Sequence, residues 1–429
     1  MWRLESDPFL TSTFANLSVL DRPVDLDRFR RRMERACVIT PRLRQRVTPG
    51  DNPRWEDDPD FEIANHVRAL SLGRNNSLQA LYDVAALAAV TPFDPRHPAW
   101  EFVLITGLRG GRGAMIQRMH HSLADGEESL RISLQFLDAE RDAPDPPPLS
   151  TPPPAPPAPA PSQGSNRGRL AEAVSRQILG FMADPTNTNA LKSAATVART
   201  VLAPLVDQPR SRLWAERSVR RKLEPLQAPL APIRAVASKL GGSLNTAFLT
   251  IAADAAGAYH RQLGEPVDHL RASMAISTRT EASGGNAFTL ARFMAPTADI
   301  GVSERFTAIG TAIAEARGQQ GAASLDTLSQ IAATLPTALI ARMARAQAQT
   351  VDFATSNLRA ASFPLYITGA QVLRNHPIGP LGGVAFNLTL MSYCGSLDMG
   401  LNVDCAAITD PPLLRRLLVD AATRFARTV

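Results

Sequence analysis

The stretch His120-His121-Ser122-Leu123-Ala124-Asp125-Gly126 joins two adjacent histidines to a carboxylate four residues after the second. Histidine is the side chain whose unperturbed pKa allows it to accept and return a proton near neutral pH. A histidine beside a substrate hydroxyl could remove its proton and later protonate a leaving group. The stretch therefore predicts acid–base chemistry, with His120, His121 and Asp125 as the candidate catalytic residues.

The flanking residues predict how these groups are held. Residues 114–119 have the composition of a strand, and residues 127–137 predict a helix with Leu130, Leu134 and Leu137 on one face. The histidines are therefore expected on a strand-to-helix loop, where a rigid scaffold often holds catalytic groups.

Two other interpretations of the histidine pair are a metal half-site and an inert polar turn. A zinc site needs further ligands at suitable spacing. The cysteines form no CxxC pair and the remaining histidines stand alone: Cys37, Cys394 and Cys405, and His66, His97, His260, His269 and His376. The sequence therefore predicts no metal site.

The whole chain has the composition of a soluble globular protein, with 45% hydrophobic and 20% charged residues. A length of 429 residues favours two domains. Three scattered cysteines indicate a reducing compartment. Residues 1–7 lack the basic and apolar regions of a secretory signal, and no run approaches the ~18 apolar residues of a membrane span. We expect a cytoplasmic protein.

The net charge of +6 could favour nucleic acid or a membrane surface. The arginines are spread out and interleaved with acidic residues, as in residues 25–35, which favours a solvated surface. Weak attraction to anionic lipid or to an acidic donor is the alternative. The few aromatic residues are not interleaved with basic ones, so no nucleic-acid partner is expected.

A segment rich in proline and alanine, residues 144–161, divides the chain. Such a segment predicts an extended spacer. Residues 1–143 form the predicted N-terminal domain, residues 144–231 the spacer with a helical crossover, and residues 232–429 the C-terminal domain. Helices are expected at about 170–182 and 190–202 within the crossover. Helices and strands are mixed in both halves, which predicts a mixed α/β fold of two domains.

The C-terminal part contains residues that typically begin or end helices. Gly241-Gly242 should end a short helix around Val236, and Ser243 should cap the next helix. Asp410-Pro411 should open a final helix with a buried leucine face. Strands are expected at residues 270–277, 363–372, 384–391 and 397–405.

Several ordered motifs together resemble those of the bacterial wax ester synthase/acyl-CoA:diacylglycerol acyltransferase family, which belongs to the CoA-dependent acyltransferase superfamily. The match covers nearly the whole chain except the proline spacer. Besides residues 120–126, it includes residues 54–68 (a W-x-x-D-x-x-F-D-x-x-x-H-V pattern), 93–101 (ending P-x-W-E), 241–245, 276–279, Gly285-Asn286, Ser356-Asn357 and 387–395.

The resemblance implies two chloramphenicol-acetyltransferase-like domains that meet at a central active-site tunnel. It implies transfer of an acyl group from acyl-CoA to diacylglycerol or a long-chain alcohol, giving triacylglycerol or wax ester. No metal or prosthetic group is required, and acyl-CoA is a co-substrate. Association with the inner face of the membrane or with lipid droplets is a further expectation, and the oligomeric state is left open.

The resemblance also implies residue roles. His121 would be the general base, and His120 would orient the loop. Asp125 would pair with Arg279 of the other domain and brace the loop, while Gly126 permits the sharp turn. The oxyanion or substrate contacts remain open among Asn245, Ser392, Asn357 and a nearby backbone N–H.

The chain departs from the family pattern at three places, which we expect to shape the pocket or its entrance. Ala99 replaces a leucine, Thr246 replaces an aspartate, and residues 358–360 replace V-P-G-P. The alternatives are therefore a specialised acceptor, such as a polyketide or glycolipid hydroxyl with a carrier-protein donor, or a non-catalytic lipid-binding relative. A serine hydrolase and a nucleotide enzyme are disfavoured, because the chain has neither a G-x-S-x-G elbow nor a glycine-rich phosphate loop.

Overall fold

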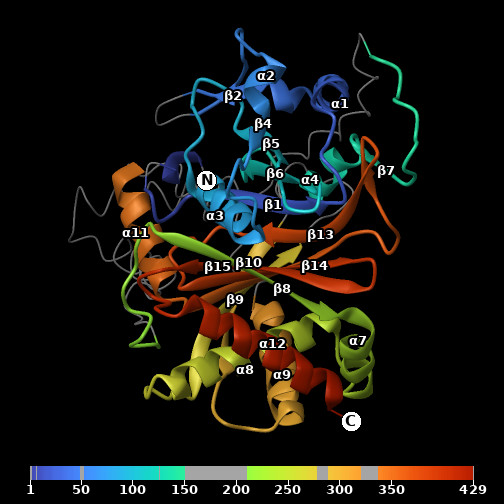
Figure 1. Ribbon diagram of the computed structural model, residues 1–429. Coiled ribbons are helices and arrows are strands. Elements are labelled where there is room, and N and C mark those ends of the chain that lie inside the picture. The colour runs from blue at the N-terminus through green and yellow to red at the C-terminus, as the bar shows by residue number, and fades with distance from the viewer. Residues whose placement is uncertain are drawn as a thin grey trace, which may run out of the picture.

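Two β-sheets lie one above the other, with most of the helices on their outer sides (Figure 1). The computed structural model describes residues 2–5, 7–48, 53–124, 126–149, 210–277, 288–319 and 337–428. The helices expected at 170–182 and 190–202 lie outside these ranges. The mixed α/β fold is confirmed.

The first sheet has seven strands in the order β4-β5-β6-β1-β13-β12-β7. All its described pairings are antiparallel except β4 with β5. Its strands are β1 (Thr13–Leu20), β4 (Val67–Ser71), β5 (Trp100–Thr106), β6 (Gly113–His120), β7 (Leu137–Asp138), β12 (Tyr366–Ile367) and β13 (Ala370–Ile378).

The second sheet has six strands in the order β10-β9-β11-β14-β15-β8. β11 runs parallel to both of its neighbours, and the other pairs are antiparallel. Its strands are β8 (Arg221–Pro229), β9 (His269–Ser277), β10 (Phe288–Pro296), β11 (Phe353–Arg359), β14 (Phe386–Tyr393) and β15 (Ser396–Asp404). β2 (Gln45–Val47) and β3 (Trp55–Asp57) form a separate small hairpin sheet.

The helices divide between the two sheets. The N-terminal half contains η1 (Trp2–Leu4), α1 (Leu26–Ile39), η2 (Pro41–Arg44), α2 (Ile63–His66), α3 (Leu78–Val90) and α4 (Gly126–Ser133). The C-terminal half contains α7 (Leu230–Lys239), α8 (Leu244–Gln262), α9 (Val302–Gln319), α11 (Thr337–Gln349) and α12 (Pro411–Arg427). No helix in the described ranges is both long enough and apolar enough to cross a bilayer.

Separate cores fix the helices on the sheets. One face of the seven-stranded sheet packs on α1 and α4 through residues such as Phe29 and Phe102, and the other face packs on α3 through Leu81 and Ile116. The six-stranded sheet buries its outer face against α7, α8, α9 and α12. The core around α3 also includes Leu223 of the six-stranded sheet, so α3 lies between the two sheets.

The interface between the sheets depends on β13. This strand comes from the C-terminal part of the sequence, yet it pairs with β1 in register from Ala15 opposite Ile378. It also packs face to face against β14 and β15. The approach is so close at Gly400 that a Cβ there would lie 1.9 Å from the carbonyl oxygen of Pro377. The predicted division at residues 143 and 231 remains a prediction.

The structure confirms several expected elements. Ser243 caps α8 by accepting the N–H of Thr246, and Asp410 caps α12 by accepting the N–H of Leu413. Gly241 has a φ of +75° after α7, a backbone conformation that favours glycine.

Two expected elements are wrong. The helix after the histidines ends at Ser133, so Leu134 is 69% exposed instead of lying on a buried face. The strand expected at 363–372 is interrupted, because Thr368 (φ +47°) and Gly369 (φ +89°) form a tight turn between β12 and β13.

Candidate functional site

The histidine pair lies where β6 ends. The N–H of His120 bonds the carbonyl of Ala99, and the N–H of His121 bonds the carbonyl of Ser12 at 2.9 Å. The chain then turns, with the N–H of Leu123 bonded to the carbonyl of His120, and α4 begins at Gly126. The predicted strand–loop–helix arrangement is confirmed, and both histidines have main chains fixed by neighbouring strands.

His120 is completely buried and both of its ring nitrogens have protein partners. The backbone N–H of Ser122 donates to Nδ1 at 3.0 Å, so Nδ1 is an acceptor. Nε2 lies 2.9 Å from the Glu5 carboxylate and therefore carries the hydrogen. The rings of Trp2 and His120 pack edge to face, with centroids 4.9 Å apart.

His121 has a different environment. Its side chain is half-buried, and its ring packs on Phe14 with centroids 4.6 Å apart. Of the two histidines, His121 alone retains solvent exposure, as a group that meets a substrate must.

The two residues that are expected to brace the histidine loop lie outside the described residues. Asp125 and Arg279 both fall between the described ranges, so their expected ion pair stays a prediction. The tunnel that they would close also stays a prediction.

The other candidate contacts belong to the six-stranded half. Asn245 is the second residue of α8, and its Nδ2 lies 3.5 Å from the Met274 sulfur. Asn357 is exposed on β11, opposite Leu390 of β14, and Ser392 follows on β14 with 9% exposure. Side chains alternate along strands and paired residues share a face, so Met274, Asn357 and Ser392 all lie on the helix side of this sheet.

A buried cluster of aromatic and histidine side chains supports the end of β6 from one side. Trp100 adjoins Ala99 and donates its Nε1 hydrogen to the carbonyl of Leu43 at 2.7 Å. His66 stacks on Trp100 with centroids 4.4 Å apart, and its Nδ1 bonds the Trp100 carbonyl at 2.9 Å. These contacts fix the backbone that receives the His120 N–H. Burial lowers the pKa of His66, so its imidazole is neutral near pH 7.

A second pair of motif residues ties the same region together. His97 Nδ1 lies 2.8 Å from the Asp58 carboxylate, whose side chain is fully buried. Burial alone would raise the pKa of Asp58, but its hydrogen bonds with His97 and the Asp60 N–H hold that pKa below the usual value. The motif residues Asp58, His66, His97 and Trp100 thus stabilise the fold next to the end of β6.

A buried ion pair lies two residues before His120. Arg118 donates Nε to Glu101 at 2.7 Å, and both side chains are more than 90% buried. Arg118 also donates to the carbonyls of Ala88 and Thr91, each at 2.6 Å. The pair therefore joins β5, β6 and the end of α3.

Two departures from the family pattern have clear positions. The Ala99 carbonyl supports His120, whereas Thr246 is buried in the helix layer, where a Cβ added to Gly310 of α9 would touch its methyl group at 3.8 Å. Arg359, in the third departure, is exposed at the end of β11.

Sequence reasoning missed Glu5, Ser12 and Ser122, which surround the histidines. Glu5 is 115 residues from His120, so no local spacing could have linked them. Ser122 lies inside the motif, and its position beside the histidines is the one available signal.

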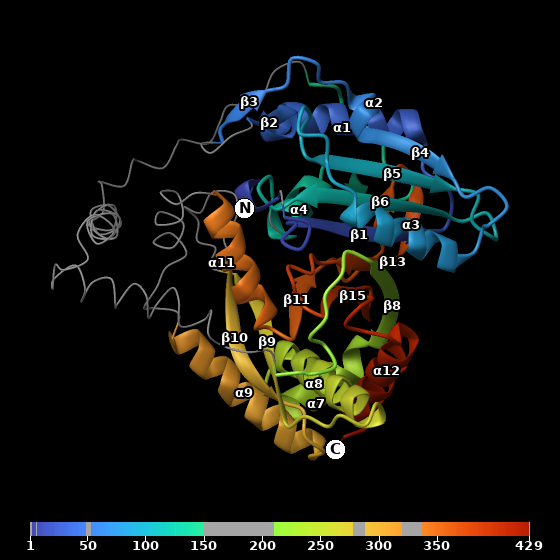
Figure 2. The same cartoon turned by 90° about the vertical axis from the view of Figure 1, so that its left-hand side faces the viewer.

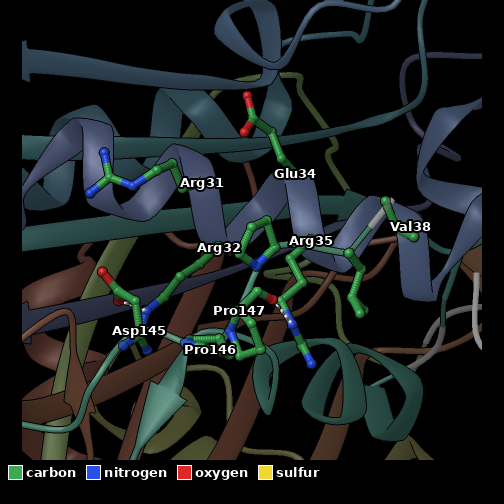
Figure 3. A pocket seen from close by; sticks show the side chains of 10 residues that line it. Arg31, Arg32, Glu34, Arg35, Val38, Asp145, Pro146 and Pro147 are labelled. Atoms are coloured by element: carbon green, nitrogen blue, oxygen red, sulfur yellow. Dashed lines mark hydrogen bonds and ion pairs between the residues drawn. The ribbon is translucent and has the colours of Figure 1, made fainter. Parts of the chain in front are cut away.

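A separate hollow of about 380 Å³ lies between α1 and residues 145–149 (Figure 3). Arg32 lines it, but its guanidinium already bonds Asp138 and Asp145 at 2.7 and 2.8 Å. The histidine loop does not line this hollow. Across the described ranges, no cluster of three or more His, Cys, Asp or Glu side chains is arranged to hold a metal ion.

Comparison with known protein families gives two matches that together cover most of the chain. Residues 8–248 match the wax ester synthase/diacylglycerol acyltransferase catalytic domain, and residues 284–425 match the C-terminal domain of the same proteins. The chain belongs to the wax ester synthase/diacylglycerol acyltransferase family. It is therefore an acyl-CoA-dependent acyltransferase, as the motifs predict.

Individual relatives agree with this assignment. A putative diacylglycerol O-acyltransferase of Mycobacterium tuberculosis (strain CDC 1551 / Oshkosh) is 31% identical over 97% of this chain and 88% of that protein. The wax ester synthase/diacylglycerol acyltransferase from Marinobacter aquaeolei VT8 has the same fold, with a TM-score of 0.64, 19% identity and coverage of 97% and 94%.

The fold extends beyond this acyltransferase family. A mutant starter condensation domain of the rhizomide synthetase RzmA, in complex with C8-CoA, matches with a TM-score of 0.57 and 12% identity. The match covers 98% of this chain and 92% of that one. For the acyltransferase described here, family membership implies acyl-CoA and a hydroxyl-bearing acceptor as the substrate classes.

Proposed function

We propose that this acyltransferase moves the acyl group of acyl-CoA directly to a hydroxyl acceptor, with His121 as the general base. The observation that carries the proposal is the division of labour in the histidine pair. Both ring nitrogens of His120 are engaged with Glu5 and Ser122 in the interior, whereas His121 is half-buried at the end of β6.

In the proposed reaction, His121 takes the proton of the acceptor hydroxyl as its oxygen attacks the thioester carbonyl. The C–O bond forms, and the resulting tetrahedral oxyanion collapses with cleavage of the C–S bond. The His121 imidazolium then protonates the departing CoA thiolate, leaving an ester and free CoA. Acid–base catalysis of this type contributes about 10²- to 10⁴-fold. No acyl-enzyme, metal or prosthetic group takes part.

The remaining candidates act around this step. Asn245, Ser392 or a backbone N–H stabilises the oxyanion, and Asn357 contacts substrate. Asp125 pairs with Arg279 and braces the loop. The intermediate exposure of Asn245 and its weak sulfur acceptor support an amide that can turn to the substrate.

The acceptor we propose is diacylglycerol or a long-chain alcohol, with triacylglycerol or wax ester as product. The names of the mycobacterial and Marinobacter relatives support this choice. The condensation domain in complex with C8-CoA supports an acyl-CoA donor in this fold. Its place as a starter condensation domain of the rhizomide synthetase also supports the second candidate, a specialised acceptor with a carrier-bound donor.

The lipid acceptor implies work at a lipid surface. We propose peripheral association in the cytoplasm with the inner face of the membrane or with lipid droplets, supported by the net charge of +6. Flotation with vesicles tests this. Salt-sensitive binding to anionic vesicles, but not to neutral ones, is expected, and absence of binding to both contradicts it.

The central experiment measures release of the CoA thiol from palmitoyl-CoA and resolves the lipid products. The acceptor panel is diacylglycerol, hexadecanol and shorter alcohols, with His121→Ala compared to wild type. His269→Ala is the matched control, because His269 is exposed at the start of β9.

Acceptor-dependent release that disappears in His121→Ala and persists in His269→Ala is expected. Absence of acceptor-dependent release in the wild type would contradict the neutral-lipid acceptor and favour the carrier-bound alternative. Full release in His121→Ala would contradict the mechanism.

A further inference from the structure

We infer that Glu5 is a positioning residue for the transfer reaction, acting on the histidine pair from the N-terminal segment, of which residues 2–5 and 7–10 are described. The inference rests on the proposed role of His121. It assigns Glu5 two tasks, which are to fix the ring of His120 and to fix the main chain that carries His121.

The first task follows from the hydrogen bonds of the His120 ring. Ser122 donates its backbone N–H to Nδ1, which leaves the ring hydrogen on Nε2. The Ser122 hydroxyl lies 2.6 Å from the same nitrogen. Nε2 then donates to the Glu5 Oε2 at 2.9 Å. A carboxylate accepts hydrogen bonds but does not donate them, so Glu5 stabilises the same tautomer that the Ser122 N–H favours and holds the ring in place.

The second task runs through Ser12. The same Oε2 of Glu5 accepts the backbone N–H of Ser12 at 3.0 Å. The carbonyl of Ser12 in turn accepts the backbone N–H of His121 at 2.9 Å. One carboxylate oxygen therefore stands two hydrogen bonds from the backbone of His121 and one from the ring of His120.

Burial makes these contacts strong. The His120 side chain is 0% exposed and that of Glu5 is 21% exposed. Hydrogen bonds to an ionised acceptor are shorter and stronger than neutral ones, and removing the acceptor leaves a buried donor unpaired. Loss of Glu5 would therefore free the ring of His120 to rotate or change tautomer, beside the residue proposed to move the proton.

The N-terminal segment is itself held by the other half of the molecule. Figure 2 shows the N-terminus beside α11, which contacts η1. Arg345 of α11 lies over the Phe9 ring at 3.9 Å and pairs with Asp7 at 3.7 Å. Arg3 donates to Thr337 at the start of α11. Glu5 is thus presented to His120 by a segment anchored on both sides.

The test compares Glu5→Ala and Glu5→Gln with wild type in the full-length protein. Glutamine keeps one acceptor oxygen but loses the charge. We expect kcat to fall by roughly 10- to 100-fold in Glu5→Ala and by less in Glu5→Gln, with KM for palmitoyl-CoA and acceptor within about 2-fold. Glu56→Gln is the matched control, since Glu56 forms an ion pair with Arg46 elsewhere in the same half.

A second readout reports directly on the ring. Long-range ¹H–¹⁵N correlation spectra of imidazole-labelled protein distinguish the two neutral tautomers. The resonance that disappears in His120→Gln identifies His120. We expect the Nε2–H form in wild type and Glu56→Gln, and a mixture of tautomers in Glu5→Ala.

Two outcomes would overturn the inference. One is an unchanged kcat and tautomer in Glu5→Ala. The other is an equal loss of kcat in Asp7→Asn, which loosens the segment without touching His120. Activity in His121→Ala would instead contradict the proposed function, and the tautomer spectra would still decide whether Glu5 orders His120.

Discussion

His376 of the seven-stranded sheet donates its Nδ1 hydrogen to the carbonyl oxygen of Met399 in the six-stranded sheet, at 3.1 Å. The bond crosses the interface between the two sheets, and the ring is 1% exposed. Burial, opposed by the charge of Asp398, lowers the pKa of His376 to about 4. The imidazole that joins the sheets is therefore neutral at physiological pH.

This bond predicts a stability that depends on pH. Unfolding returns the His376 pKa to about 6.5, so the unfolded state gains a proton first as the pH falls. The stability that the neutral ring contributes is fully present above pH 6.5 and is lost progressively as the pH falls toward 4. The loss in the free energy of unfolding is about 2 kcal/mol by pH 5. Urea unfolding at pH 7.5 and 5.0 should show a smaller difference for His376→Gln than for wild type. Equal differences would contradict the prediction, because His66 and His260 are unchanged in both proteins.

Gly400 gives a test of the interface that does not depend on pH. Its added Cβ would lie 1.9 Å from the Pro377 oxygen, which belongs to backbone and cannot rotate away. Gly400→Ala should destabilise the protein by about 3 kcal/mol or more. Gly318→Ala is the opposite control, because Gly318 lies in α9 with open space around it, and alanine there should stabilise by about 0.5–1 kcal/mol. Thermal unfolding of both variants checks the signs.

The Glu101–Arg118 pair should be sensitive to removal of one partner. Glu101→Gln leaves the Arg118 guanidinium buried without its counter-charge, so we expect a loss of about 3–5 kcal/mol. Adding Arg118→Met to Glu101→Gln should recover part of that loss, since the unpaired charge is then gone. A double-mutant cycle by urea unfolding measures the coupling, and purely additive effects would show that the pair is not coupled.

Asn245 is the candidate oxyanion donor whose amide has only a weak acceptor, the Met274 sulfur at 3.5 Å, among the described contacts. Asn245→Ala should lower kcat by about 10²- to 10³-fold with little change in KM, because an oxyanion donor acts in the transition state. Ser392→Ala is measured in parallel. A large effect in Ser392→Ala alone would transfer the role to that residue, and wild-type kcat in both would leave it to a backbone N–H.

Local sequence signals predicted the elements that local chemistry decides. The Asp410 cap and the leucines at 413, 414, 417 and 418 place α12 within one residue of its observed start. The strand leading to His120 follows from the apolar run before it. The strand predicted at 363–372 fails because a threonine with positive φ breaks it, and threonine carries no local signal for that conformation.

The site divides in the same way. The motif identifies His120 and His121, because their chemistry is contained in seven adjacent residues. Glu5 reaches His120 only through the folded N-terminal segment, and His376 meets Met399 only through the packing of two sheets. Relationships of that kind are set by tertiary structure and leave no periodic trace in the chain.

The place of β13 beside β1 has a consequence for how the molecule is made. Residue 378 completes a sheet whose partner strand begins at residue 13, so the ribosome must synthesise most of the chain before that sheet can close. Until then, the edge of β1 that will receive β13 stays unpaired, and such edges promote aggregation. The two halves are therefore synthesised one after the other but must complete their folding together. We expect a nascent N-terminal half to need a chaperone that the folded protein does not need.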